Sequence, residues 1–449
     1  MSLEYSKKYY KQLEQAVENE ENQFLIQEFS GKHYADISEI LYQLDGPSCK
    51  YILELLGPDV RADVISDLEE DIRIEFLKQY TAEEVAEVID HLDSDDAVDL
   101  LNEQPIKARE EVLTAIQDSE QAAYIMELLH YDEDCAGGLM AKELIRANIN
   151  WTVKQCIDEI RRQAERVEKI MTVYVVDDHN ILMGRVSLKE IILSKDDTKI
   201  QDIYVPEIAL VHTFQQEEEV AELMQKYDLE VVPVVNVQGK LLGRITIDDI
   251  VDVITEQAEI DQQAMAGISE NVESSDGIWA LTRARLPWLI VGMIGGLFGA
   301  QFIGVFENEL TLVPAMAFFI PLITATGGNV GIQSSTIMVQ SMAGSSYIHD
   351  TLWDHFVKVI GVAGVNGLTM ASLVFGFNYF FAGPELAMVV SSALFCVVML
   401  ASVMGTVTPV VLDRFGINPA LASGPFITTA NDLLGLGVYF SVAKMLLHL

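Results

Sequence analysis

The sequence predicts a multidomain membrane protein with an all-α superhelical N-terminal domain, a tandem α/β domain pair and an α-helical transmembrane domain of five spans. Three observations predict this class. Long apolar spans appear only after residue 285, and the period of the apolar residues changes from helical to strand-like near residue 138. The 449 residues include 29 Lys/Arg and 68 Asp/Glu, but residues 278–449 hold only five and seven of them, which leaves 24 and 61 before that point.

Residues 1–135 are predicted to form an acidic domain of helical repeats. Apolar residues recur at spacings of three and four, as at Val85, Val88 and Ile89. Turn signals such as the Gly-Pro pair at residues 57–58 cut this pattern into short, closely spaced helices. Such a pattern is typical of a superhelix of stacked repeats.

An internal repeat follows this domain. Residues 176–191 align without gaps on residues 235–250, at an offset of 59 residues. Each copy contains a strand, a turn, a second strand that ends in Gly-Arg-apolar-hydroxyl, and a helix. The repeat predicts two copies of one α/β module, at residues 136–200 and 201–256. An acidic, helix-prone segment at residues 257–280 connects the second module to the transmembrane domain, residues 281–449.

Five apolar spans are each at least as long as the roughly 20 residues that a bilayer crossing needs. They lie at about 286–306, 312–341, 356–382, 386–412 and 422–447. Arg283 and Arg285 precede the first span, so the positive-inside rule places the N-terminal domains in the cytoplasm, and an odd number of spans places the C-terminus outside. Lys444, near that end, is an exception that we expect to snorkel outward. We expect a multi-pass protein of the plasma (inner) membrane, with the lipid bilayer as a partner.

Two of the spans carry polar side chains. Amides in the second span must face another helix or a water-filled path, because their exposure to lipid is costly. Asp432 interrupts the fifth span, and an intramembrane carboxylate, which costs roughly 3 kcal/mol or more on insertion scales, marks an ion path by default. The residues that we expect to line such a path are Asn329, Gln333, Thr336, Thr428, Thr429 and Gly435.

The chemistry of these side chains favours a hard divalent cation. Mg²⁺ keeps several waters and takes one or two carboxylates, and Asp432 would supply two in a homodimer. The predicted faces contain no His or Cys, which argues against softer metals. The residues alone leave magnesium, manganese and calcium open.

The acidic charge before the spans bears on other classes of function. It attracts cations and repels nucleic acid, so we expect no nucleic-acid partner. The sequence contains no nucleophile–base pattern, P-loop or catalytic metal-ligand cluster, so we do not expect an enzyme.

The whole chain resembles the MgtE family of magnesium channels. Three segments carry the resemblance: Tyr-Asp-Glu-Asp-Cys-Ala-Gly-Gly-Leu-Met at residues 131–140, the segment around Thr-Gly-Gly-Asn at residues 321–334, and Gly-Pro-Phe-Ile-Thr-Thr-Ala-Asn-Asp at residues 424–432. The internal repeat resembles a tandem pair of CBS domains. The resemblance therefore implies a helical N domain, two CBS domains, a connecting helix and five spans.

The resemblance also implies sites. It implies a homodimer in which Asp432 binds hydrated Mg²⁺ in the pore. Acidic residues between the N and CBS domains would bind intracellular Mg²⁺, which draws these domains together so that the connecting helices close the pore. The residues expected to take part in this sensing are Asp95, Asp96, Asp248, Asp249, Asp252, Glu259 and Asp261.

CBS clefts often hold adenine nucleotides, so ATP or a related nucleotide is an implied ligand besides Mg²⁺. Thr246 and Asp249 match the hydroxyl and acid that meet phosphate and ribose in nucleotide-binding CBS domains. The alternative is that these two residues only cap the following helix.

The implied function is a magnesium-selective channel or transporter that moves Mg²⁺ into the cytoplasm down its electrochemical gradient and is gated by intracellular Mg²⁺. The alternatives are an exchanger coupled to Na⁺ or H⁺, a broader transporter that takes Mn²⁺ or Co²⁺, and a membrane-anchored nucleotide sensor. Two departures from the family pattern bear on gating. Asn418 precedes Pro419 where an aspartate is expected, and Gln257 and Ile260 stand where acids are expected. We therefore expect weaker gate-side cation sites and a pore that closes less tightly, or at higher Mg²⁺.

Overall fold

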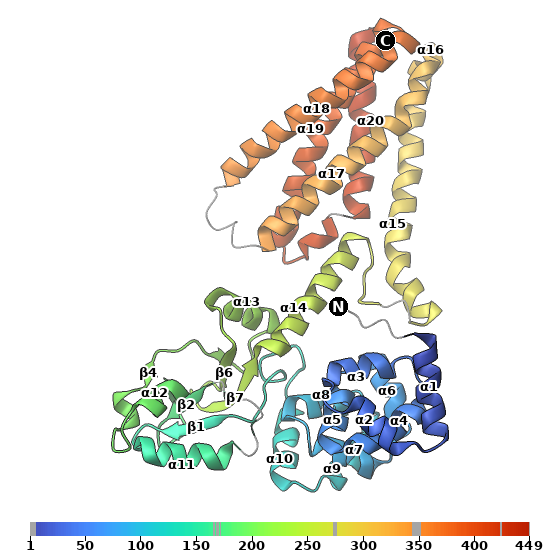
Figure 1. Cartoon of the computed structure of the whole chain (residues 1–449). Coiled ribbons are helices and arrows are strands. Elements are labelled where there is room, and N and C mark those ends of the chain that lie inside the picture. The colour runs from blue at the N-terminus through green and yellow to red at the C-terminus, as the bar shows by residue number, and fades with distance from the viewer. Residues whose placement is uncertain are drawn as a thin grey trace. The chain divides into compact units, whose positions relative to one another are not determined.

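The computed structural model describes residues 6–164, 167, 170, 172–272, 276–343, 352–422 and 424–448. The chain divides into two compact units, Met1–Ile254 and Thr255–Leu449 (Figure 1).

Short α-helices make up the beginning of the first unit, as the apolar period predicts. Gly57 has a positive φ of 94° and ends one helix, and Pro58 begins the next, so the Gly-Pro pair separates two repeats. The helices are α1 (Lys7–Glu18), α2 (Asn22–Phe29), α3 (Tyr34–Leu41), α4 (Gly46–Leu56), α5 (Pro58–Ser66), α6 (Glu70–Leu77), α7 (Ala82–Ile89), α8 (Ser94–Asn102), α9 (Ile106–Ala115) and α10 (Ser119–Leu128).

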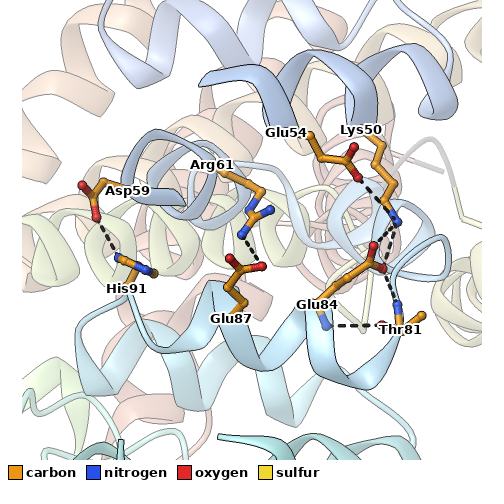
Figure 2. A network of polar contacts seen from close by, with 8 residues as sticks. All are labelled: Lys50, Glu54, Asp59, Arg61, Thr81, Glu84, Glu87 and His91. Carbon is orange, nitrogen blue, oxygen red and sulfur yellow. Dashed lines mark hydrogen bonds and ion pairs between the residues drawn. The ribbon is translucent and has the colours of Figure 1, made fainter. Parts of the chain in front are cut away.

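Ion pairs join successive repeats of this helical domain on one side (Figure 2). Lys50 of α4 and Arg61 of α5 both reach α7, where they pair with Glu84 and Glu87 at 2.9 Å each. Glu84 also forms a capping box with Thr81 at the start of α7. Leu, Ile and Val side chains from the same helices fill a continuous buried core beneath. The helical N domain predicted from the sequence is confirmed.

Two small sheets follow, and the first of them includes residues 205–206, beyond the boundary expected between the α/β modules at residue 200. The first contains β1 (Ile145–Asn148), β2 (Val173–Val176), β3 (Leu182–Val186) and β4 (Val205–Pro206), with α11 (Val153–Gln163), α12 (Leu188–Leu193) and the 3₁₀ turn η1 (Ile200–Asp202). The second contains β5 (Val211–His212), β6 (Val231–Val235) and β7 (Leu241–Thr246), with α13 (Glu217–Tyr227) and α14 (Ile247–Met265).

The internal repeat is visible in the strand register. Val175 of β2 pairs with Gly184 of β3, and Val234 of β6 pairs with Gly243 of β7. In both hairpins the register shifts at the next residue, so the two modules share one irregularity. The prediction of two copies of one α/β module is therefore confirmed, and equivalent residues pair in both copies.

Two glycines explain the Ala-Gly-Gly motif between α10 and β1. A Cβ atom at Gly138 would lie 2.4 Å from the carbonyl oxygen of Asp132, and one at Gly137 would lie 2.5 Å from the ring of Tyr131. The backbone nitrogen of Gly137 donates to the carbonyl oxygen of Thr213 at 3.0 Å. The motif thus lets the chain after the helical domain pass close to the second module.

The second unit is a helical membrane domain. Its elements are α15 (Ile278–Val305), α16 (Glu307–Leu312), η2 (Pro314–Phe319), α17 (Ile320–Ala343), α18 (Leu352–Phe381), α19 (Pro384–Arg414), η4 (Pro419–Ala422) and α20 (Pro425–Leu447). Among the described residues, five helical stretches are long and apolar enough to cross a membrane, in agreement with the prediction. α19 packs against α17, α18 and α20 and is the most buried of them.

Lys444 has a partner on this unit. Its Nζ lies 3.3 Å from a carboxylate oxygen of Glu309 on α16, so the ends of the first and fifth spans lie side by side (Figure 1). The ion pair accounts for a cation at a helix end where the loop-charge pattern does not favour one.

Candidate cation sites

An acidic cluster lies inside the first unit, where α8 is close to the start of α14. Each of these helices begins with two consecutive aspartates in its first turn, where the positive end of the helix dipole favours carboxylates. The structure brings together five of the predicted sensing residues: Asp95, Asp96, Asp248, Asp249 and Asp252.

These carboxylates raise one another's pKa values. Burial, and then the charge of Asp249, raises the pKa of Asp95 well above its ordinary value. Burial raises the pKa of Asp249 to about 6, although hydrogen bonds from Thr246 oppose the shift. Burial followed by the charge of Asp248 also raises the pKa of Asp252. The acidic cluster therefore stores repulsion that a bound divalent cation would relieve.

Two further carboxylates belong to this acidic cluster. Asp93, Asp95 and Glu143 each place an oxygen so that the three atoms lie within 4.8 Å of one another. Glu143 is buried; one of its oxygens accepts from the hydroxyl of Ser94 at 2.8 Å, and the other has no partner within the described part of the chain. Arg244 pairs with Asp93 at 3.4 Å. Sequence reasoning missed Asp93 and Glu143; for Glu143 the only signal was an acid soon after the Gly-Gly motif.

Thr246 and Asp249 are engaged with each other. The carboxylate of Asp249 accepts from the hydroxyl and the amide of Thr246, at 2.7 and 3.2 Å. These two bonds are the reach-back half of a capping box, and both the cap and nucleotide binding at this pair stay predictions. A small cleft between the two modules is lined instead by Thr172, Tyr174 and Arg244, among others. The buried hydroxyl of Tyr174 has no hydrogen-bond partner among the described residues, and the cleft, with a volume of about 10 Å³, has room for about one water.

Glu259 and Asp261 lie further along α14, within the second unit. Glu259 is exposed. Asp261 is half-buried, and one of its oxygens accepts from the side-chain amides of Gln257 and Asn418, at 3.2 Å each.

The intramembrane carboxylate sits at a contact between α17 and α20. A Cβ atom at Gly328 would lie 3.3 Å from Thr428 and 3.8 Å from an oxygen of Asp432. Asp432 is half-buried and makes no ion pair within the described part of the chain. The Thr-Gly-Gly-Asn segment of α17 therefore supplies the small residue that lets the polar turn of α20 approach.

The other predicted pore residues fall into two groups. Asn329 and Gln333 are exposed on a single copy of the chain, and Thr336 is half-buried. Thr429 packs against Gly295 of α15, and Gly435 is buried against α17 and α19.

Sequence reasoning missed Asn431. Its side chain is buried against Gly331, and both of its amide atoms lack a partner among the described residues.

These features define a class of protein: a multi-span membrane protein with a carboxylate in one span and an acidic cluster in its first unit. A family described as divalent cation transporter (MgtE) matches residues 320–442, the MgtE intracellular N domain matches residues 32–134, and CBS domains match residues 136–195 and 200–256. The chain is 33% identical over 442 residues to the magnesium transporter MgtE of Thermus thermophilus, which covers 97% of this chain and 98% of that protein. The chain belongs to the MgtE family of magnesium transporters.

Other relatives agree. The chain is 35% identical over 334 residues to the magnesium transporter MgtE of Enterococcus faecalis, over 74% of this chain and 73% of that one. The crystal structure of the soluble part of a magnesium transporter is 31% identical and covers 56% of this chain and 99% of its own, with a TM-score of 0.51. The cytosolic domain of the Mg²⁺ channel MgtE in complex with ATP is 31% identical and covers 54% and 98%, with a TM-score of 0.50. The relatives are named for transport rather than catalysis.

Proposed function

We propose that this chain is a homodimeric magnesium channel that admits Mg²⁺ into the cytoplasm down its electrochemical gradient and that intracellular Mg²⁺ closes it. The observation that carries the proposal is Asp432, a carboxylate without an ion-pair partner in the described structure, on a membrane-spanning helix beside Gly328 and Thr428. A carboxylate with hydroxyl and amide neighbours suits a cation that keeps part of its water shell. The name of each curated relative supports magnesium over the other hard cations.

The homodimer is supported by the exposed amides of α17. Asn329 and Gln333 would meet lipid on a single copy, at a cost that a partner or a water-filled path removes. A second copy would also bring a second Asp432 to the same path. We propose that Asn329, Gln333, Thr336 and Thr428 hold waters of the passing ion.

Gating is supported by the acidic cluster of the first unit. Without cations the carboxylates of α8 and α14 repel, and divalent cations would stabilise the arrangement in which they meet. We propose that Asp95, Asp96, Asp248, Asp249 and Asp252 bind intracellular Mg²⁺ there.

The remaining parts take their roles from this scheme. We propose the domain division 1–135, 136–200, 201–256, 257–280 and 281–449, with the first three parts in the cytoplasm and the C-terminus outside. We propose that the CBS modules bind an adenine nucleotide with Thr246 and Asp249 among its contacts, and the similar cytosolic domain that was solved in complex with ATP supports this ligand.

Rescue of growth tests the function. A bacterial strain without its own magnesium uptake is grown on limiting Mg²⁺ with the native chain, with Asp432→Asn, or with Asp413→Asn as a control for an exposed acid at the end of α19. The native chain and Asp413→Asn should restore growth and Asp432→Asn should not. Equal rescue by all three would contradict the pore assignment.

Flux into liposomes separates the channel from a coupled exchanger. Mg²⁺ influx through the native chain should continue when Na⁺ and H⁺ gradients are abolished. Influx that requires either gradient would favour the exchanger, and equal flux of Mn²⁺ or Co²⁺ would favour the broader transporter.

A further inference from the structure

The end of the connecting helix α14 is fastened to the segment that leads into α20. Asn418, just before η4, donates its side-chain amide to a carboxylate oxygen of Asp261 at 3.2 Å. Gln257, one turn earlier on α14, donates to the same oxygen at 3.2 Å. No Lys or Arg in the described part of the chain is paired with Asp261, so two neutral amides hold this carboxylate.

The orientation of the Asn418 amide is fixed by a third contact. Its oxygen accepts from the backbone nitrogen of Ala420 at 2.8 Å, where it caps η4. The nitrogen must then point the other way, toward Asp261. A carboxylate at position 418 would keep the cap but would present a second anionic oxygen to Asp261.

Close packing at the same place supports this contact independently. Ala264 of α14, Ala420 of η4 and Val339 of α17 form one buried apolar cluster. A Cβ atom at Gly424 would lie 2.7 Å from the carbonyl oxygen of Met265, so only glycine permits this approach of the two backbones.

Asp432 lies seven residues after Pro425, the first residue of α20, on the same helix. A helix rises 1.5 Å per residue, so the start of α20 lies roughly 10 Å along the helix axis from Asp432.

We propose that Asn418, Gln257 and Asp261 form a latch that holds the connecting helix against the base of α20 without a bound cation. The inference rests on the proposed function, because the latch regulates transport only if α20 lines the pore. It replaces the expectation that the missing acids at positions 257 and 418 weaken closure. Amide donors satisfy Asp261 directly, so the closing contact here does not depend on Mg²⁺.

Disulfide formation in the full-length chain tests the latch without requiring transport. Ala264→Cys and Ala420→Cys are introduced after replacement of the four native cysteines by alanine, and oxidative cross-linking in membranes is compared in EDTA and in millimolar Mg²⁺. The comparison is between the chain with Asn418, Asn418→Asp, and Asn308→Asp, which adds the same charge at an exposed site of α16.

The chain with Asn418 and Asn308→Asp should cross-link in EDTA. Asn418→Asp should cross-link roughly ten- to hundredfold less in EDTA, from the loss of one hydrogen bond to a charged group, and Mg²⁺ should restore it. Undiminished cross-linking of Asn418→Asp in EDTA would overturn the latch, as would EDTA-sensitive cross-linking of the chain with Asn418 or no cross-linking in any chain.

If the cysteine pair prevents folding, currents in inside-out patches without Mg²⁺ provide the second measurement. Asn418→Asp should then be open more often than the native chain, and equal open probabilities would overturn the latch. Cross-linking as expected in a chain that carries no Mg²⁺ would refute the proposed function and leave the contact intact.

Discussion

Replacing Asp95 by Asn should stabilise the first unit when divalent cations are absent and should weaken its response to Mg²⁺. Oxygens of Asp95, Asp93 and Glu143 lie within 4.8 Å of one another, so Asp95 takes part in two repulsive pairs. At that separation two unit charges repel by about 0.9 kcal/mol in water and by about 3.5 kcal/mol at an effective dielectric constant of 20. Arg244 offsets part of the field at Asp93, and the side chains of Asp93 and Asp95 are only half-buried. We therefore expect a gain of about 1–3 kcal/mol.

Thermal unfolding of a fragment spanning residues 1–256 measures this effect. A gain of 1 kcal/mol raises the Tm of a domain of this size by about 2–4 °C, so Asp95→Asn should unfold about 2–12 °C higher in EDTA. Added Mg²⁺ should raise the Tm of the native fragment more than that of the variant, because one ligand is missing. Glu39→Gln removes the same charge from an exposed site on α3. Equal stabilisation by both variants, or an unchanged Mg²⁺ response in Asp95→Asn, would refute the reasoning.

Three further substitutions test the packing. Gly331→Ala places a Cβ atom 1.9 Å from the amide nitrogen of Asn431, which should cost about 1–3 kcal/mol of stability. The variant should therefore show a lower Tm in detergent and slower Mg²⁺ uptake. Gly376→Ala, which meets open space, should change neither. Gly138→Ala meets a backbone oxygen at 2.4 Å and should shift the urea midpoint of the 1–256 fragment down, and an unchanged midpoint would contradict the close approach. Lys444→Gln breaks an exposed ion pair and should cost at most about 1 kcal/mol in thermal unfolding; a larger loss would mean that the pair is shielded from water.

Most of the fold was predictable because its signals are local. The change of apolar period marks the transition from helices to strand–helix modules, and the Gly-Arg step repeats because both hairpins share one register and one irregularity. The five spans follow from length and hydropathy alone. The aspartates at the starts of α8 and α14 were predictable for a related reason, since acids in a first helical turn stand out in sequence.

The contacts that complete the sites were not predictable, because they join residues far apart in the chain. Glu143 meets Ser94 across 49 positions, and Asn418 meets Asp261 across 157. No period or motif links such pairs, and only tertiary packing brings them together. The loss of an acid at position 418 was visible in the sequence, but the direction in which the new amide points was not. Under the proposed latch, that direction would reverse the expected consequence for closure, which stays a prediction.

A channel that is closed both by a cation-free latch and by a cation-dependent acidic cluster should show a distinct pattern of Mg²⁺ inhibition. In a two-state equilibrium each closing contact multiplies the ratio of closed to open channels. Asn418→Ala divides that ratio by the same factor at every Mg²⁺ concentration, so its inhibition curve should move to higher Mg²⁺ with nearly unchanged steepness. Asp95→Asn removes a cation ligand, so its curve should become shallower. Inside-out patch currents with Mg²⁺ titrated on the cytoplasmic side distinguish the two, and a shallower curve for Asn418→Ala would show that position 418 contributes to a cation site rather than to a latch.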